Sequence, residues 1–223
     1  GTTRFFDMYW HAPDAARAAA DTGIRMVASQ IVIEMDGMPA NGPDRAADGW
    51  HALAEVSPLI EPCLAAHAIY TTSEELLRRI AAIADDLGTR VQIHLSETEQ
   101  EVIDCVAAHG VRPAAYLDRV GLLHDRMVLA HGLWLDDDEL ALVAERGATV
   151  VTNPVSNMKL ASGATVGGGP AHAFPYPAAK AAGVPMGIGT DGAASNNTLD
   201  LLADVKVLAL LQKHHSGDPS TLP

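Results

Sequence analysis

The sequence predicts an α/β fold, a TIM-type (β/α)8 barrel that is one strand short of a closed ring. Short apolar runs alternate with helical patterns along the 223-residue chain, which is typical of repeated βα units around a parallel sheet. Side chains able to do chemistry directly follow several of these runs, as they do at the carboxyl ends of barrel strands. The expected strands are Arg4–Trp10, Met26–Ile33, Ile60–Ala68, Val91–Leu95, Met127–Leu133, Thr149–Asn153 and Val184–Gly189.

Local sequence signals place the helices between these strands. Thr72 with Glu75, and Asp136 with Glu139, have the spacing of capping boxes and predict two helix starts. Apolar residues then recur at helical spacing until a glycine, which favours the left-handed backbone found at helix ends. A mobile glycine-rich loop and the longest helix are expected near the end of the chain. The two helices are expected to end at Gly88 and Gly147. The loop is expected at Gly163–Pro170 and the longest helix at Asn197–His214.

Composition favours a single domain over residues 1–223 and a small-molecule partner. With 48% hydrophobic residues the chain can build a core, yet no apolar run approaches the roughly 20 residues of a membrane span. The net charge of -13 argues against nucleic acids and anionic membrane surfaces, because phosphate binding needs Lys and Arg. Cys63 and Cys105 are the only cysteines, which argues against a disulfide framework and fits a reducing cytoplasm.

His94 and Glu97 are the first pair of candidate catalytic residues. The run Val91–Leu95 continues into H-L-S-E, so a carboxylate follows a strand-end histidine by three residues. A neutral imidazole on a rigid strand can bind a metal ion, and a nearby acid can move protons to and from metal-bound water. A core histidine and a glutamate that stabilises a helix start are the plainer interpretations. Glu101, in the next turn, is expected to be an ordinary solvated residue.

Three further candidates follow other strands. Asp191 lies between two small residues after Val184–Gly189, and we predict a metal ligand, although Gly-Thr-Asp-Gly alone is more typical of a turn. His131 follows M-V-L-A and is either a second ligand or a cationic group that orients the attacking water and stabilises negative charge. His67, in L-A-A-H-A-I-Y, fits a hydrogen bond to substrate about as well as a core position.

Four ordered motifs make the chain resemble one group of hydrolases. They are H-L-S-E-T-E-Q-E-V, V-L-A-H-G, T-N-P-V-S-N-M-K-L-A-S-G and G-I-G-T-D-G-A-A-S-N-N-T-L-D. From Arg4 to Lys213 the chain is similar to the amidohydrolase superfamily, in particular its adenosine-type deaminases and triazine chlorohydrolases, with the methylthioadenosine/S-adenosylhomocysteine deaminases nearest. The resemblance implies the barrel of a metal-dependent hydrolase that uses zinc or another divalent metal such as iron.

The resemblance also implies roles for single residues. His94 and Asp191 match metal ligands, Glu97 matches the acid/base carboxylate, and His131 matches the histidine that assists it. Asp191 would also hold or receive a proton from the nucleophile. His67 matches a histidine that contacts substrate, although the proline usual before the following tyrosine is absent. The residues that match a pocket-shaping motif are Asn153, Ser156 and Asn157.

Two features of the family are missing from this sequence. The first strand of the family carries a His-x-His pair that supplies two further metal ligands, and no two histidines here stand two apart. The flanking segments that build a small terminal β domain are also missing. We therefore expect one truncated barrel domain that lacks its first strand and the terminal β domain, with two exposed sheet edges, low stability in isolation and a longer native polypeptide.

We expect a metal-dependent hydrolytic deaminase that releases ammonia from an adenosine-like or other amino-substituted N-heterocycle. The alternatives are a triazine-type chlorohydrolase or aminohydrolase, a cyclic-amide hydrolase, and a non-catalytic fragment that needs the missing His-x-His segment. The expected partners are a small heterocyclic substrate and, by the resemblance, further copies in a homo-oligomer. Contacts to the sugar or side-chain part of the substrate are expected within Val32–Trp50, which contains Met35, Asp36, Met38 and Arg45.

Overall fold

The computed structural model describes residues 2–34 and 43–222, and its contacts divide the chain into two compact units. The amino-terminal unit contains residues 2–93 and 119–122, and the carboxyl-terminal unit contains residues 94–118 and 123–222. That residues 1–223 form a single domain stays a prediction. Met35, Asp36 and Met38 lie outside the described residues, so their contact with substrate also stays a prediction.

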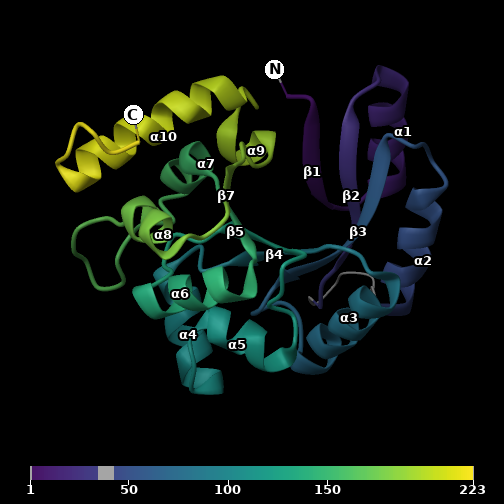
Figure 1. Cartoon of the computed structure of the whole chain (residues 1–223), viewed down its shortest axis with the longest axis horizontal. Coiled ribbons are helices and arrows are strands. Elements are labelled where there is room, and N and C mark those ends of the chain that lie inside the picture. The colour runs from purple at the N-terminus through teal and green to yellow at the C-terminus, as the bar shows by residue number, and fades with distance from the viewer. Residues whose placement is uncertain (1, 35–42, 223) are drawn as a thin grey trace. The chain divides into compact units, whose positions relative to one another are not determined.

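The amino-terminal unit is a parallel sheet with helices packed against it (Figure 1). Its strands pair in chain order, and the middle strand is buried almost throughout, as expected for a strand covered on both faces. Alanines of the first helix pack with Met26 and Ala28 of this strand in one apolar cluster. The elements are β1 (Arg4–Tyr9), α1 (Ala12–Thr22), β2 (Arg25–Val32), α2 (Pro43–Ala54), β3 (Ile60–Ala68) and α3 (Glu74–Leu87).

The carboxyl-terminal unit continues the same alternation of strands and helices (Figure 1). The boundary between the units falls within β4 (Val91–Leu95), and β5 (Met127–His131), β6 (Thr149–Thr152) and β7 (Met186–Ile188) pair in parallel. No helix in the described ranges combines the length and the apolarity that crossing a membrane requires. The helices are α4 (Glu99–His109), α5 (Pro113–Val120), α6 (Asp137–Arg146), α7 (Pro154–Lys159), α8 (Tyr176–Ala182), α9 (Ala193–Asn196) and α10 (Leu201–Ser216).

The seven predicted strands are all present, with ends within two residues of those expected. The predicted helix ends are also confirmed, because Gly88 and Gly147 have left-handed backbones with φ of 61° and 73°. The capping box of Asp136 and Glu139 is confirmed in both of its hydrogen bonds.

Two predicted helix starts are wrong. The helix after β3 begins at Glu74, with Ser73 at the cap position. The backbone N–H of Ser73 donates to the Glu34 carboxylate, and the predicted capping box of Thr72 and Glu75 does not form. The last helix begins at Leu201 rather than Asn197. The backbone around Asn197 is left-handed, and Asp200 accepts hydrogen bonds from the first N–H groups of the helix.

Asp136→Ala is expected to lower the free energy of unfolding by about 1 kcal/mol, because Asp136 accepts the Glu139 N–H at 2.9 Å and caps α6. Urea titration followed by circular dichroism measures the change. Asp137→Ala is the matched control, since Asp137 lies in the same turn but is not the cap, and its effect should stay within about 0.5 kcal/mol. Equal losses in the two variants would contradict the capping role.

Candidate active site

Four of the predicted site residues lie in or just after strands, and all four belong to the carboxyl-terminal unit. His94 lies in β4, and Glu97 comes two residues after the end of that strand. His131 is the last residue of β5, and Asp191 comes three residues after the end of β7. The backbone is left-handed at His131 and Asp191, with φ of 76° and 60°, and also at Ser96, with φ of 50°. Such a conformation costs a non-glycine residue of order 1–3 kcal/mol and occurs preferentially at functional sites. The strand ends are therefore shaped to present these side chains.

Gly132 lets the chain turn away directly after His131. Its own backbone is also left-handed, with φ of 62°, and a Cβ at this position would lie 2.7 Å from Cγ1 of Val150. A glycine is required here, because the two left-handed residues in succession bring the chain against β6.

His131 is the centre of a buried contact network. Its Nδ1 lies 2.7 Å from Oδ1 of Asn157 and 3.4 Å from Nδ2 of Asn153. The other ring nitrogen, Nε2, lies 3.8 Å from Oε2 of Glu97. The ring also stacks on His94, with ring centroids 5.4 Å apart. His131 is 2% exposed, and these neighbours hold its ring in a fixed place.

Glu97 has a second anchor besides His131. Its Oε1 accepts a hydrogen bond of 2.9 Å from the hydroxyl of Ser162. The hydroxyl of Thr98 caps α4, so Glu97 is not needed for that purpose. The Glu97 side chain is 17% exposed, which leaves its carboxylate accessible for proton transfer.

The Asp191 carboxylate is held in its ionised form. Ser156 and Ser195 donate hydroxyls to Oδ2 at 2.6 and 2.9 Å, and the backbone N–H of Gly192 donates to Oδ1 at 2.6 Å. Burial raises the pKa of Asp191, but these hydrogen bonds outweigh the effect of burial and leave the pKa below its ordinary value. Asp191 therefore offers a negative oxygen at neutral pH.

His94 and Asp191 carry the donor types predicted for a metal site. A neutral imidazole and an ionised carboxylate are both ligands that zinc accepts. Within residues 2–34 and 43–222, however, no three His, Cys, Asp or Glu side chains gather as a metal-binding group. Catalytic zinc sites typically use three protein ligands, so a zinc ion here would need more donors than these two residues.

His67 belongs to the amino-terminal unit and is partly exposed near the end of β3, rather than buried in the core. Its Nδ1 lies 2.7 Å from the hydroxyl of Thr71. The rings of Tyr9 and Tyr70 lie 6.0 and 6.2 Å from that of His67, and Trp10 is 5.4 Å from Tyr9. Partly exposed aromatic rings of this kind suit a planar heterocycle.

Comparison with known proteins decides the family. The profile of the Amidohydrolase family matches residues 1–222. The chain belongs to the amidohydrolase family. A 5'-deoxyadenosine deaminase of Methanopyrus kandleri is 43% identical over 99% of this chain and 49% of its own length. A 5-methylthioadenosine/S-adenosylhomocysteine deaminase of Nitratidesulfovibrio vulgaris is 40% identical over 100% of this chain and 49% of its own. This amidohydrolase chain thus spans about half the length of the curated relatives it matches.

Solved structures confirm the predicted α/β fold class. An adenosine deaminase from Xanthomonas campestris with bound zinc is 36% identical, with a TM-score of 0.88 over 100% of this amidohydrolase chain and 49% of that protein. An atrazine chlorohydrolase from Arthrobacter aurescens in complex with zinc gives a TM-score of 0.82 over 98% of this chain and 51% of its own. That protein is 22% identical, so the likeness concerns the fold alone.

Glu101 is a residue of this amidohydrolase that the sequence interpretation assigned wrongly. It was expected in solvent, but it is 5% exposed, and its carboxylate accepts the backbone N–H groups of Ser96 and Glu97. Burial raises the pKa of Glu101 to about 7 despite these hydrogen bonds. A carboxyl whose folded-state pKa is raised favours folding at low pH and opposes it as the pH rises toward 7. The fold thus keeps Glu101 at a cost in stability.

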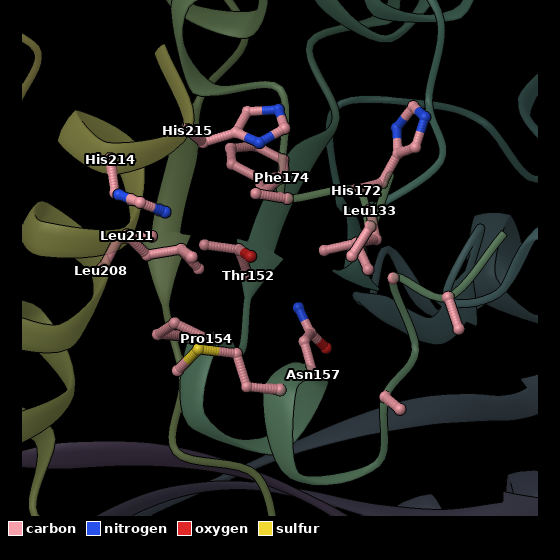
Figure 2. Close-up of a pocket in the computed structure, with 16 residues that line it drawn as sticks. Leu133, Thr152, Pro154, Asn157, His172, Phe174, Leu208, Leu211, His214 and His215 are labelled. Carbon is pink, nitrogen blue, oxygen red and sulfur yellow. The ribbon is translucent and has the colours of Figure 1, made fainter. Parts of the chain in front are cut away.

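A cavity of about 510 Å³ lies within the carboxyl-terminal unit, beside the network of His131. Figure 2 shows Thr152 and Asn157 pointing into it, among apolar side chains of α7 and α10 and around Phe174, with histidines also in the lining. The hydroxyl of Thr152 and Nδ2 of Asn157 have no hydrogen-bond partner within the described part of the chain. His94, Glu97 and Asp191 are not among the lining residues, so the cavity reaches the site only through Asn157.

Proposed function

We propose that the polypeptide containing this chain is a metal-dependent deaminase that hydrolyses an adenosine derivative and releases ammonia. The observation that carries the proposal is the contact network in which His131 lies beside Glu97, His94 and Asn157, while Ser156, next to Asn157 in the chain, donates to Asp191. Support also comes from relatives more than 40% identical that are named as 5'-deoxyadenosine deaminases.

The proposed mechanism assigns proton transfer to Glu97. A bound divalent metal ion supplies a more acidic water molecule, and His94 and Asp191 would hold that ion together with further ligands. Glu97 takes a proton from the attacking water and returns it to the leaving amino group. Ser162 donates a hydrogen bond to the Glu97 carboxylate, and the His131 ring lies beside it.

His131 and Asp191 complete the proposed chemistry. Nε2 of His131 faces Glu97 and is placed to orient the nucleophile and stabilise the charge that develops on it, while Asn157 holds the ring in place. Asp191, whose pKa is lowered, accepts a hydrogen bond from the nucleophile. We further propose that His67 contacts the substrate and that Tyr9 and Tyr70, which lie beside His67, stack on the heterocyclic ring of the substrate.

The alternative reactions are less well supported. A triazine-type chlorohydrolase uses the same metal and acid, but the likeness to atrazine chlorohydrolase is 22% in sequence, against 43% for a deaminase.

Cys63 and Cys105 are both buried and unbridged, which supports the proposed reducing cytoplasm. Zinc as the metal and self-association into a homo-oligomer stay proposals.

A substrate panel tests the function. The full-length protein, loaded with zinc, is incubated with 5'-deoxyadenosine, methylthioadenosine, S-adenosylhomocysteine, guanine and a chlorinated triazine. Ammonia release from the adenosine derivatives, lost on chelation and restored by added zinc, is the expected result. Chloride release from the triazine without deamination of any adenosine derivative would favour the chlorohydrolase instead.

A further inference from the structure

The Glu101 side chain accepts hydrogen bonds from two consecutive backbone N–H groups, those of Ser96 and Glu97. Its Oε1 accepts the N–H of Ser96 at 2.7 Å, and its Oε2 accepts the N–H of Glu97 at 2.9 Å. Thr98 in turn accepts the N–H of Glu101 at 3.2 Å and caps α4. A carboxylate that uses both oxygens in this way fixes the direction of the bend as well as its position.

The backbone bend at Ser96, next to Glu97, is strained, and backbone hydrogen bonds from the segment after β5 also hold it. Ser96 is left-handed, with φ of 50°, a conformation that persists only where the surroundings impose it. The N–H groups of Gly132 and Trp134 donate to the carbonyls of Leu95 and Ser96 at 3.0 and 2.9 Å. The residues after β4 are thus held between α4 and the segment that follows His131.

We propose that Glu101 is a positioning residue that keeps the Glu97 carboxylate in place for proton transfer. The inference rests on the proposed role of Glu97 as acid and base. Glu97 must reach Ser162 and His131 at 2.9 and 3.8 Å, and a side chain four bonds long keeps that geometry only while its backbone is fixed. Glu101 acts through Glu97 and contacts neither substrate nor metal.

Glu101→Gln separates this role from simple structural support. Glutamine has the same shape but one acceptor oxygen, so its NH2 group would oppose one of the two backbone N–H groups and loosen the bend. We expect kcat to fall roughly 10- to 100-fold, as for a small misplacement of a catalytic group, while KM and the metal content stay near wild type. Adding Glu101→Gln to Glu97→Gln should cause no further loss.

Glu139→Gln is the matched control. Glu139 is 3% exposed and also lies in the first turn of a helix, where it accepts the backbone N–H of Ala114 at 2.8 Å. Its other partners are Arg112 and the backbone N–H of Asp136, and none of these residues belongs to the candidate active site. Glu139→Gln is expected to lower stability and to leave kcat per folded, metal-loaded molecule unchanged.

The outcomes distinguish the two claims, with folding checked by circular dichroism and metal measured per chain in every full-length variant. Wild-type kcat in Glu101→Gln, or a loss equal to that in Glu139→Gln, would overturn the positioning role. Full activity in Glu97→Gln would overturn the proposed function instead. If Glu101→Gln does not fold, Glu101→Asp replaces it, because its shorter carboxylate cannot reach both N–H groups, and the same loss of kcat at constant KM is expected.

Discussion

Glu97→Gln is expected to reduce kcat roughly 1,000-fold, within the usual contribution of a general acid and base. The amide keeps the length of the side chain and can still accept the Ser162 hydroxyl, but it cannot take a proton from water. Metal content should not change, since Glu97 is not a proposed ligand. Steady-state ammonia release and elemental analysis of the same protein preparation measure both quantities.

The control for this variant is Glu99→Gln. Glu99 begins α4 two residues further along and contacts the N–H of Val166, away from His131. Its kcat should lie within about twofold of wild type, as for substitutions outside the site. Activity within tenfold of wild type in Glu97→Gln would remove Glu97 from the mechanism.

Asp191→Asn is expected to weaken metal binding by more than about 100-fold and to abolish turnover at limiting metal. Loss of a residue that only hydrogen-bonds to a metal ligand already weakens metal binding by up to roughly 100-fold, and loss of a ligand should cost more. Asparagine tolerates the left-handed backbone at this position, with φ of 60°, so the turn after β7 is retained. The change therefore reports the loss of the negative charge rather than of the fold. Competition with a chromophoric chelator gives the metal affinity.

Asp200→Asn is the corresponding control. Asp200 is an aspartate that accepts backbone N–H groups at the start of α10, and asparagine caps a helix equally well. Its metal affinity and kcat should match those of wild type. Unchanged metal affinity in Asp191→Asn would show that Asp191 is not a ligand, even if activity were lost.

Strands were more predictable than helix starts for a physical reason. Each of the seven strands coincides with a run rich in apolar residues that is visible in sequence, although β1 itself is mostly exposed. A helix start depends on local backbone geometry and on which of several neighbouring polar residues accepts the exposed N–H groups. At α3 Ser73 lies at the cap position without a side-chain hydrogen bond, and at α10 Asp200 caps the helix after a left-handed segment that begins at Asn197.

The candidate site was predictable only in part for a related reason. His94, His131 and Asp191 follow apolar runs, and topology alone brings strand ends to one edge of a sheet. Glu101 was missed because its partners are backbone N–H groups, which leave no trace in side-chain sequence. The contacts of Asn157 with His131 and of Ser156 with Asp191 were likewise invisible, although the resemblance had marked both residues.

The proposed catalytic residues and the proposed substrate residues fall in different compact units of the chain. Glu97, His131 and Asp191 lie in the carboxyl-terminal unit, whereas His67 and its aromatic neighbours lie in the amino-terminal unit. On these roles, residues that recognise the substrate can be varied separately from those that transfer protons. Libraries that aim to change substrate preference should therefore target codons for residues 2–93.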